Sequence, residues 1–227
     1  MATLDDVLIT AELARRPRRS PNYAAENRAL ADLAEAMADS PQTILQKLVE
    51  MALDLCRADS AGISILEPGE AAGVFRWHAI AGPFASNIGG EMPREASPCG
   101  VVLDRNASVL FSYPERYFDY GMAIDPPIVE TLLVPFHTKG KPVGSLWVIA
   151  HTPSRQFDAE DQRLLTSLSR FAAVAYQMTT ALVATDAGLK AKADEVRQIL
   201  GAAAHRQTQA FFALTQCLRG SFQIRNL

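Results

Sequence analysis

Cys99 has the greatest capacity for covalent chemistry in this sequence. It lies between Pro98 and Gly100, a context that predicts the first turn of a short helix, where the helix dipole lowers the pKa of a thiol and raises its reactivity. The other interpretation, which we favour, is a small buried packing residue, because unpaired cysteine is among the most buried residue types. Cys56 and Cys217 lie in other segments, and three widely spaced cysteines suit a reducing cytoplasm better than a disulfide scaffold.

Three histidines fall on or at the ends of predicted strands and could face one cleft: His78, His137 and His151. With Cys99 they offer nitrogen and sulfur ligands, but no metal-ligand spacing supports a metal site. We therefore favour exposed or hydrogen-bonded histidines. A nucleophilic pair of Cys99 with a histidine is weaker still, because no residue is identified that would orient the base.

Arg116 lies between Tyr113 and Tyr117, and a guanidinium among aromatic rings suits an anionic or planar ligand. A salt bridge from Arg116 to Asp119 or Asp104 is an equal alternative.

Two tryptophans, Trp77 and Trp147, are predicted on neighbouring strands. They either pack in the core, which we favour, or form a platform for a ligand. The region 97–120 is the best candidate for a binding region as a unit. The candidate ligand-binding residues are Trp77, Cys99, Tyr113, Arg116, Tyr117 and Trp147.

The elements that position these residues begin with a clear strand–turn–strand–helix pattern. Two apolar runs of strand length, 132–136 and 143–150, flank a turn-forming segment. Asp158 is a good N-cap for a following helix, and Glu160 and Asp161 lie in its first turn, where the helix dipole favours negative charge.

Further elements are predicted upstream. Helices over about 21–38 and 41–56 each follow a Ser-Pro pair, which supplies an N-cap and a first helical residue. Strands are predicted at 61–66, 74–81 and 108–112. With the two runs described above, they predict an α+β fold with one antiparallel sheet of five or six strands flanked by helices.

Alternation in the strand at 74–81 places Phe75, Trp77 and Ala79 on one face. Residues 82–129 then form a long excursion rich in proline and glycine, which is functional or disordered when it occurs inside a compact domain. Its aromatic content argues against disorder and predicts that it packs over the domain. Five aromatic residues fall within ten positions: Phe111, Tyr113, Tyr117, Phe118 and Tyr120.

A heptad seam runs through the C-terminal third of the chain. Alternating steps of four and three residues lead from Leu164 to Ala210, and eleven of the fourteen positions visited are apolar. A helix from Asp158 to about residue 200 is ~65 Å long, so one domain covers only part of it. The rest is predicted to pair with a second copy as a parallel homodimer.

Composition narrows the functional class. The net charge of −3 over 227 residues argues against a nucleic-acid partner. No apolar run approaches the ~20 residues that span a bilayer, and the N-terminus lacks an apolar signal core. A soluble cytoplasmic protein without a membrane partner is predicted. Its expected parts are a flexible solvated arm at 1–20, a main domain at 21–180, and a long C-terminal helix with its tail at 181–227.

A joint pattern is formed by segments 61–64, 75–82, 93–94, 97–104, 113–118, 133–136, 144–151 and 157–161. On these segments, the chain from about residue 23 to 177 resembles a bacterial GAF domain, of the branch found ahead of histidine kinase modules. The resemblance implies that 21–180 is a sensory domain with a ligand cleft between one face of the sheet and the excursion 82–129. It also implies terminal helices that dimerise and carry a signal, with the signalling helix and its tail at 181–227. His205, on the C-terminal helix, weakly resembles a kinase phosphoacceptor, but we favour a chance match.

The chain also departs from the better characterised classes of that family. It lacks the asparagine-lysine/phenylalanine-aspartate constellation of cyclic-nucleotide binders. Cys99 is followed by Gly100 and not by the histidine usual in bilin-binding photoreceptors. Its cysteines are not clustered as in the free methionine sulfoxide reductases of this fold. Those ligands and that chemistry are therefore not carried over.

The sequence thus predicts a non-catalytic sensory module in two-component signal transduction. It would bind an unidentified small molecule, with the cofactor unknown, and act with a histidine kinase or response regulator, or as a fragment of such a kinase. Two alternatives stay open: a thiol-dependent reductase using Cys99, and a ligand-free dimerisation module.

Overall fold

The computed structural model describes residues 2–67, 73–120 and 124–223, with side chains for all of these except Pro41, Val196 and residues 199–223. Contacts divide the chain into a first unit, residues 1–179, and a second unit, residues 180–227. The side chains of His205 and Cys217 therefore lie outside the described part. The helices are α1 (Leu4–Val7), α2 (Glu12–Arg15), α3 (Tyr23–Asp39), α4 (Ile44–Leu55), α5 (Pro98–Arg105) and α6 (Ala159–Gln223), with short 3₁₀ helices η1 (Pro41–Thr43), η2 (Pro83–Asn87), η3 (Arg94–Ala96) and η4 (Pro114–Arg116).

The first unit is built on one six-stranded sheet in the order β3-β2-β1-β6-β5-β4, in which every neighbouring pair is antiparallel. This confirms the predicted α+β class. The sixth strand, β3, has only three residues and ends in a proline, so it carries no alternation that a sequence pattern could reveal. The strands are β1 (Ser60–Glu67), β2 (Val74–Ala81), β3 (Glu91–Pro93), β4 (Val109–Ser112), β5 (Glu130–Thr138) and β6 (Lys141–Ala150).

A register shift in the β1–β2 pair changes the face assignment of β2. Ile63 pairs with Ala79 while the next residue, Ser64, pairs with Trp77, so His78 is the extra residue of a bulge. Phe75 and Trp77 pack in one cluster with Ile80, whereas Ala79 belongs to the cluster on the other face. The predicted grouping of Ala79 with Phe75 and Trp77 was therefore wrong, because strict alternation cannot anticipate a bulge.

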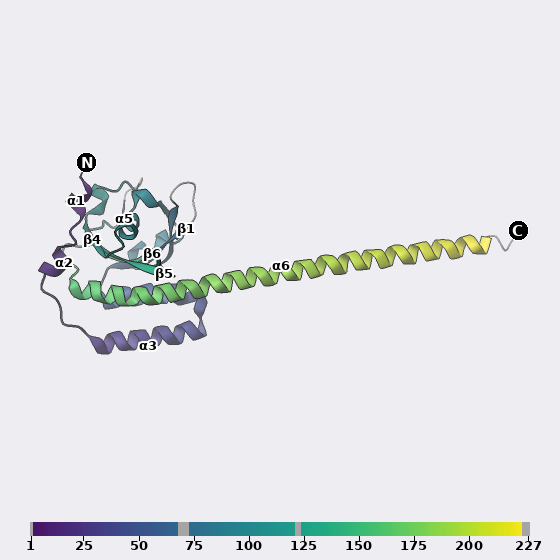
Figure 1. Cartoon of the computed structure of the whole chain (residues 1–227), viewed down its shortest axis with the longest axis horizontal. Coiled ribbons are helices and arrows are strands. Elements are labelled where there is room, and N and C mark those ends of the chain that lie inside the picture. Colours follow the sequence, from purple (N-terminus) through teal and green to yellow (C-terminus); the bar gives the residue numbers. More distant parts are fainter. Residues whose placement is uncertain (1, 68–72, 121–123, 224–227) are drawn as a thin grey trace. The chain divides into compact units, whose positions relative to one another are not determined.

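One face of the sheet is covered by α4 and the first turns of α6, and α3 packs against α4 as an outer layer (Figure 1). The amphipathic face predicted for the second helix is present, since α4 buries Ile44, Leu48 and Val49 completely. From α6, Leu165 and Leu168 pack into the same cluster. Burying apolar side chains against the sheet stabilises this layer by about 1.5–3 kcal/mol for each large residue.

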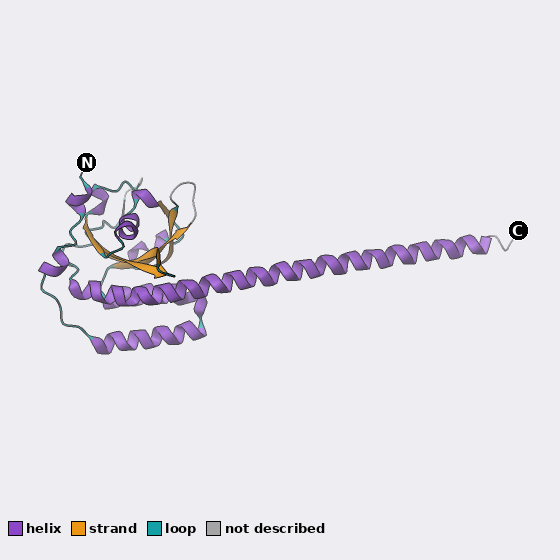
Figure 2. Cartoon of the chain, viewed as in Figure 1, coloured by secondary structure: helices purple, strands orange, loops and turns teal. Residues whose placement is uncertain are grey.

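The opposite face of the sheet lies under the excursion 82–129 and α5, as the secondary-structure view shows (Figure 2). Phe75, Phe111 and Val102 are fully buried there, so the excursion is packed, as its aromatic content predicted. Ser97 caps α5 by accepting a hydrogen bond from the backbone N–H of Gly100 at 3.0 Å. The cap fixes where α5 begins.

Residues 1–20 differ from the expected flexible arm. Val7 and Leu13 are buried, and Leu8 forms an isolated antiparallel bridge to Phe111 of β4. The backbone N–H of Ile9 also donates to the carbonyl of Leu110 at 2.8 Å. The segment thus lies along β4, the edge strand of the sheet. The sequence did not predict this contact, because the cluster of Arg15, Arg16, Arg18 and Arg19 suggested a solvated arm.

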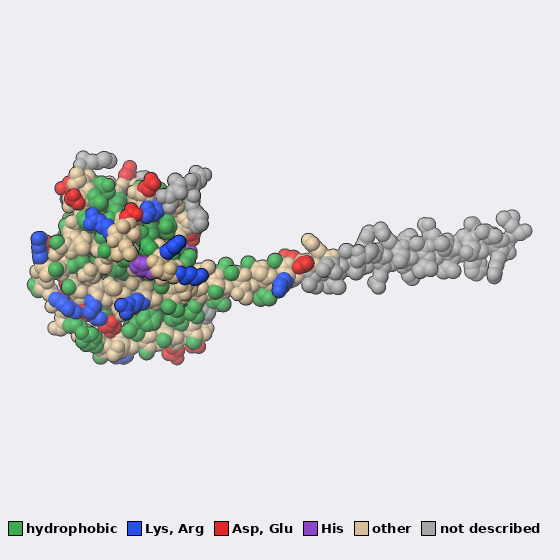
Figure 3. Space-filling view, viewed as in Figure 1, with side chains coloured by type: hydrophobic (Ala, Val, Ile, Leu, Met, Phe, Trp, Pro, Cys, Tyr) green, Lys and Arg blue, Asp and Glu red, His purple; other side chains and the backbone are tan. Residues whose placement is uncertain are grey.

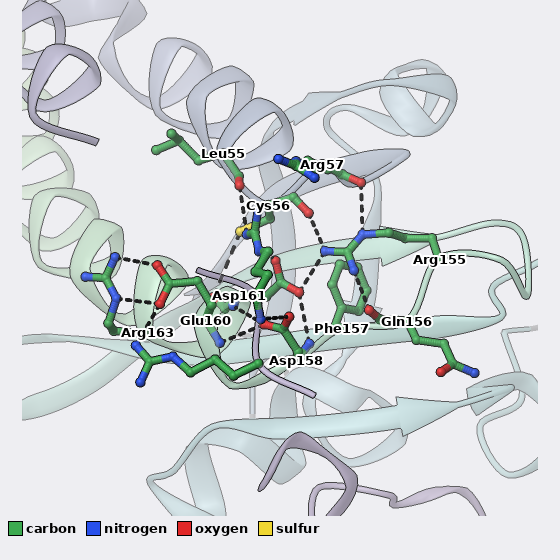
Figure 4. A network of polar contacts seen from close by, with 12 residues as sticks. Leu55, Cys56, Arg57, Arg155, Gln156, Phe157, Asp158, Glu160, Asp161 and Arg163 are labelled. Atoms are coloured by element: carbon green, nitrogen blue, oxygen red, sulfur yellow. Dashed lines mark hydrogen bonds and ion pairs between the residues drawn. The ribbon is translucent and has the colours of Figure 1, made fainter. Parts of the chain in front are cut away.

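Three of the four arginines of this segment, Arg16, Arg18 and Arg19, contact residues at or just before the start of α6, whereas Arg15 pairs with Glu12. Arg18 pairs with Glu160 at 2.8 Å and Arg19 with Asp161 at 2.5 Å. Figure 4 shows the two carboxylates beside Asp158, with Arg155 and Arg163 directed toward them. Buried carboxylates require such partners, so the basic cluster has a structural role.

The N-cap predicted for α6 is present in reciprocal form. The Asp158 carboxylate accepts from the backbone N–H groups of Glu160 at 2.7 Å and Asp161 at 3.1 Å, while Asp161 accepts from the N–H of Asp158 at 2.9 Å. The helix continues to Gln223, past the predicted end near residue 200. Among the described residues, no helix combines the length and apolar run that a bilayer crossing needs.

Candidate functional site

A cleft lies between the sheet and the excursion. Its outer part has a volume of about 430 Å³ and its inner part about 70 Å³. The two parts form one continuous site, because five residues line both of them: Trp77, Phe84, Met92, Tyr120 and Ile124.

The inner part is lined by uncharged side chains and reaches the sheet at Trp147 and Leu133. The Trp147 indole N–H donates to the Ser64 hydroxyl at 2.9 Å, which satisfies its one polar atom while the ring faces the cleft. Gly62 lies directly opposite Trp147 across the β1–β6 pair, and a Cβ there would collide with the indole. The glycine of the Ala-Gly-Ile-Ser segment is thus what allows Trp147 to lie flat on the sheet.

Trp77 rests on a second glycine. A Cβ on Gly90 would lie 2.8 Å from the Trp77 ring, and the Trp77 backbone N–H donates to the carbonyl of Gly90 at 3.0 Å. β1 separates the strands that carry Trp77 and Trp147, so the prediction that these strands are neighbours was wrong. The two indoles nevertheless line the same inner cavity from the same face.

Cys99 lies in the first turn of α5, as predicted, and lines the inner cavity. It is only 6% exposed. Burial raises the pKa of its thiol, which is opposite to the lowering expected from the helix dipole. The neutral thiol dominates at physiological pH, so Cys99 packs as a small apolar residue there.

The other three predicted ligand residues lie elsewhere. Tyr113, Arg116 and Tyr117 flank or form η4 and are all exposed. None of them lines either part of the cleft. Tyr117 packs edge to face against Phe118, with ring centroids 4.9 Å apart, and this anchors η4. Asp104, one suggested partner of Arg116, forms its ion pair with Arg94.

The three histidines do not share a cleft. His78 contacts Glu67 at 2.8 Å, His137 contacts Asn106 at 2.6 Å, and His151 contacts Ser60 at 2.8 Å. In the described part of the chain, no three histidine, cysteine or acidic side chains are grouped as metal ligands would be. Hydrogen-bonded histidines, the favoured interpretation, account for all three.

Sequence reasoning missed several residues that line the cleft. Phe84 follows β2 and stacks on His151, with centroids 5.2 Å apart. Met92 lies on the unpredicted β3, and no local pattern marked it. Tyr120 was visible as the last member of the aromatic cluster, and its burial raises the pKa of its phenol.

Several solved structures share this fold. The GAF domain of an Acinetobacter phosphoenolpyruvate-protein phosphotransferase is 20% identical, with a TM-score of 0.59 over 70% of this chain and 94% of that one. The GAF domain of a phosphoenolpyruvate-protein phosphotransferase from Coxiella burnetii is 16% identical, with a TM-score of 0.58 over 72% of this chain and 99% of that one. The free methionine-R-sulfoxide reductase from Neisseria meningitidis, solved with its substrate, is 15% identical, with a TM-score of 0.57 over 73% of this chain and 97% of that one. At these identities the likeness concerns the fold.

A comparison with curated proteins gives no match. A family model described as "GAF domain" matches residues 38–177, which is more than half of the chain. The match spans the sheet, the excursion and the first turns of α6, and it includes all the residues that line the cleft described above. The chain belongs to the GAF domain family.

Proposed function

We propose that this chain is a non-catalytic sensory module that binds a small molecule in the cleft and signals through α6 in a parallel homodimer. The observation that carries the proposal is the preformed cleft. Its volume falls within the range of small-molecule sites, and its lining is largely apolar and aromatic. The output partner proposed is a histidine kinase or response regulator of a two-component system.

The contacts around Glu130 offer a route from the cleft to α6. Thr131 lines the inner cavity, and the preceding Glu130 accepts a hydrogen bond from the backbone N–H of Phe157 at 3.1 Å. Phe157 and Asp158 directly precede α6. A ligand that displaces the start of β5 would therefore alter the N-terminal turn of α6, provided that it binds the two arrangements with different affinity.

The heptad positions of the second unit support the dimer part of the proposal. Leu182 and Leu189 lie on the predicted seam and are 40% and 63% exposed in the single chain. Figure 3 shows hydrophobic side chains along the described part of this helix. An exposed apolar row at heptad spacing is stabilised when a second helix covers it.

The thiol-reductase alternative receives less support than the sensor. The raised pKa of the Cys99 thiol leaves little thiolate, and the other described cysteine, Cys56, lies in the cluster on the opposite face of the sheet. A resolving thiol is therefore not adjacent among the described side chains.

Native mass spectrometry of the protein from its own host, with an absorbance spectrum above 300 nm, tests the proposal. We expect extra mass that is released on denaturation, and its loss in Trp77→Ala. A dimer of bare polypeptide would favour the ligand-free dimerisation module instead. A bare monomer would overturn the signalling-helix part.

A further inference from the structure

We infer that the cleft selects an amphipathic organic cation, with a flat apolar body and one ammonium or amidinium group. This inference rests on the proposed sensory function and names the class of ligand. It follows from how charge and aromatic rings are distributed over the lining.

The charged lining residues all lie at the mouth of the cleft. Glu91, Asp119 and Asp125 line the outer cavity and are exposed. Phe84 and Met92 line the same cavity and are buried. Neither part of the cleft has a lysine, arginine or histidine among its described lining residues. A ligand that enters therefore passes three carboxylates and meets uncharged walls beyond them.

Basic groups near the mouth are already engaged by acids. Arg76 forms ion pairs with two carboxylates, that of Glu91 and, at 2.9 Å, that of Glu67. Glu67 in turn contacts His78 at 2.8 Å. One arginine thus serves two carboxylates, so it does not reverse the sign of the charge at the mouth. Arg94, which follows the lining residue Pro93, is paired with Asp104.

The aromatic walls favour the same class of ligand. Trp77, Phe84 and Tyr120 line both parts of the cleft, so a cationic head near the mouth lies within reach of aromatic faces. A cation over such a face is attracted by the quadrupole of the ring. Burial raises the pKa of the Tyr120 phenol, which keeps it neutral and able to donate a hydrogen bond.

The apolar body of the ligand needs the outer cavity of about 430 Å³ as well as the inner one, because the inner volume of about 70 Å³ is smaller than the ~150 Å³ of a cavity that binds benzene. Trp147, Leu133 and Ile149 form the walls of the inner cavity, and its described lining carries no charged side chain. A ligand anion would lose its water in a cleft whose described lining contributes three carboxylates and no lysine, arginine or histidine, an arrangement that desolvation and like-charge repulsion both oppose. The aromatic walls thus favour a flat body that can stack on them, and charge favours a positive head.

Three indoles with the same ring and different charge test the inference: tryptamine, tryptophol and indole-3-acetate. Calorimetric titration of the full chain should give a dissociation constant about tenfold lower for tryptamine than for tryptophol at low salt, with indole-3-acetate weakest. The advantage of tryptamine over tryptophol should shrink at high salt, because the carboxylates are exposed.

Variants at the mouth separate charge from shape. Glu91→Gln combined with Asp125→Asn should weaken tryptamine binding about fivefold or more and leave tryptophol binding unchanged. Asp32→Asn on α3 is the matched control, because this residue is exposed and lines neither part of the cleft. The control should leave all three affinities unchanged.

Two results would overturn the inference. Equal affinities for the three indoles, or tightest binding of indole-3-acetate, would refute the charge selection while leaving the sensory cleft intact. Absence of binding by all three would refute it as well. The sensory proposal fails on a different result, namely that the protein from its own host releases no ligand.

Discussion

Arg16 joins the N-terminal segment to the sheet through a bidentate contact with Glu130, a residue 114 positions away. Its two terminal nitrogens donate to the two carboxylate oxygens at 2.9 and 2.7 Å. Arg16 also donates to the carbonyl of Phe157 at 2.7 Å, and Glu130 accepts from the N–H of the same residue. This one pair therefore holds together the N-terminal segment, the start of β5 and the entry to α6.

Replacing Arg16 by methionine should destabilise the first unit by about 2–4 kcal/mol. The Glu130 side chain is only 5% exposed, so the variant leaves a buried carboxylate without its cationic partner. Urea unfolding followed by tryptophan fluorescence measures the change, because Trp77 and Trp147 both lie in this unit.

The neighbouring Arg15 provides a matched control. It pairs with Glu12 at 2.9 Å, but its side chain is 73% exposed. Arg15→Met should change the free energy of unfolding by no more than about 0.5 kcal/mol. Equal effects of the two variants would show that the pair with Glu130 does not anchor the N-terminal segment.

Adding one methyl group at Gly62 should disturb the floor of the cleft. The new Cβ overlaps the Trp147 ring, so the indole must leave its position and release its bond to Ser64. We expect Gly62→Ala to lose about 2–3 kcal/mol of stability, as overpacking commonly does, and to alter tryptophan fluorescence. Gly188→Ala is the control, because its Cβ meets nothing and the change favours a helix by about 0.5–1 kcal/mol. An unchanged fluorescence spectrum in Gly62→Ala would contradict the role given to Gly62.

Glu160 makes stability depend on acidity. Ion-paired hydrogen bonds from Arg163, opposed by partial burial, lower the pKa of Glu160 from 4.5 to about 2. The unfolded chain therefore binds more protons between these values, so this contribution is complete above about pH 4.5 and is lost as the pH falls toward 2. The difference in stability between the wild-type protein and Glu160→Gln should shrink over that window.

The neighbouring Asp161 has the opposite effect on the pH dependence of stability. Burial raises the pKa of Asp161 despite its arginine partners, so it takes up a proton more readily in the folded state and does not add to the loss. A gap between the wild-type protein and Glu160→Gln that stays constant as the pH falls from 4.5 to about 2 would rule out the linkage.

Cys99→Ser should keep the fold and bind the cleft ligand within about threefold of the wild-type protein, because the thiol packs as a small side chain there. Alkylation at pH 8, mapped by peptide mass, should modify Cys99 and Cys56 slowly in the folded protein and rapidly in urea, since burial raises the pKa of both thiols. Modification of native Cys99 at the rate of a free thiol would revive the reductase alternative.

Much of the fold was accessible to sequence reasoning because its signals are local. The capped start of α6, the hairpin of β5 and β6 and the face of α4 each follow from residue types within one or two turns of chain. The His78 bulge and β3 were not accessible. A bulge is decided by pairing with β1, and a three-residue edge strand has no period of its own.

The candidate site divides in the same way. Trp77 and Trp147 were identified on predicted strands and Cys99 at the start of a predicted short helix, and the fold brings all three to the inner cavity. Tyr113, Arg116 and Tyr117 share a sequence cluster with Tyr120, but the short η4 helix turns them outward. Which members of an aromatic cluster face inward depends on backbone turns that composition does not encode.

Substituting aspartate at both Leu182 and Leu189 should convert the proposed dimer to a monomer. A charge at seam positions would be buried against the partner helix without a counter-ion, which coiled coils do not tolerate. Val183→Asp is the matched control, because Val183 is an exposed apolar residue one position away from the seam. Sedimentation equilibrium should give half the mass for the double variant and an unchanged mass for the control. If the double variant stays dimeric, the dimer contact lies on another surface, and the row of apolar residues on α6 has no role in assembly.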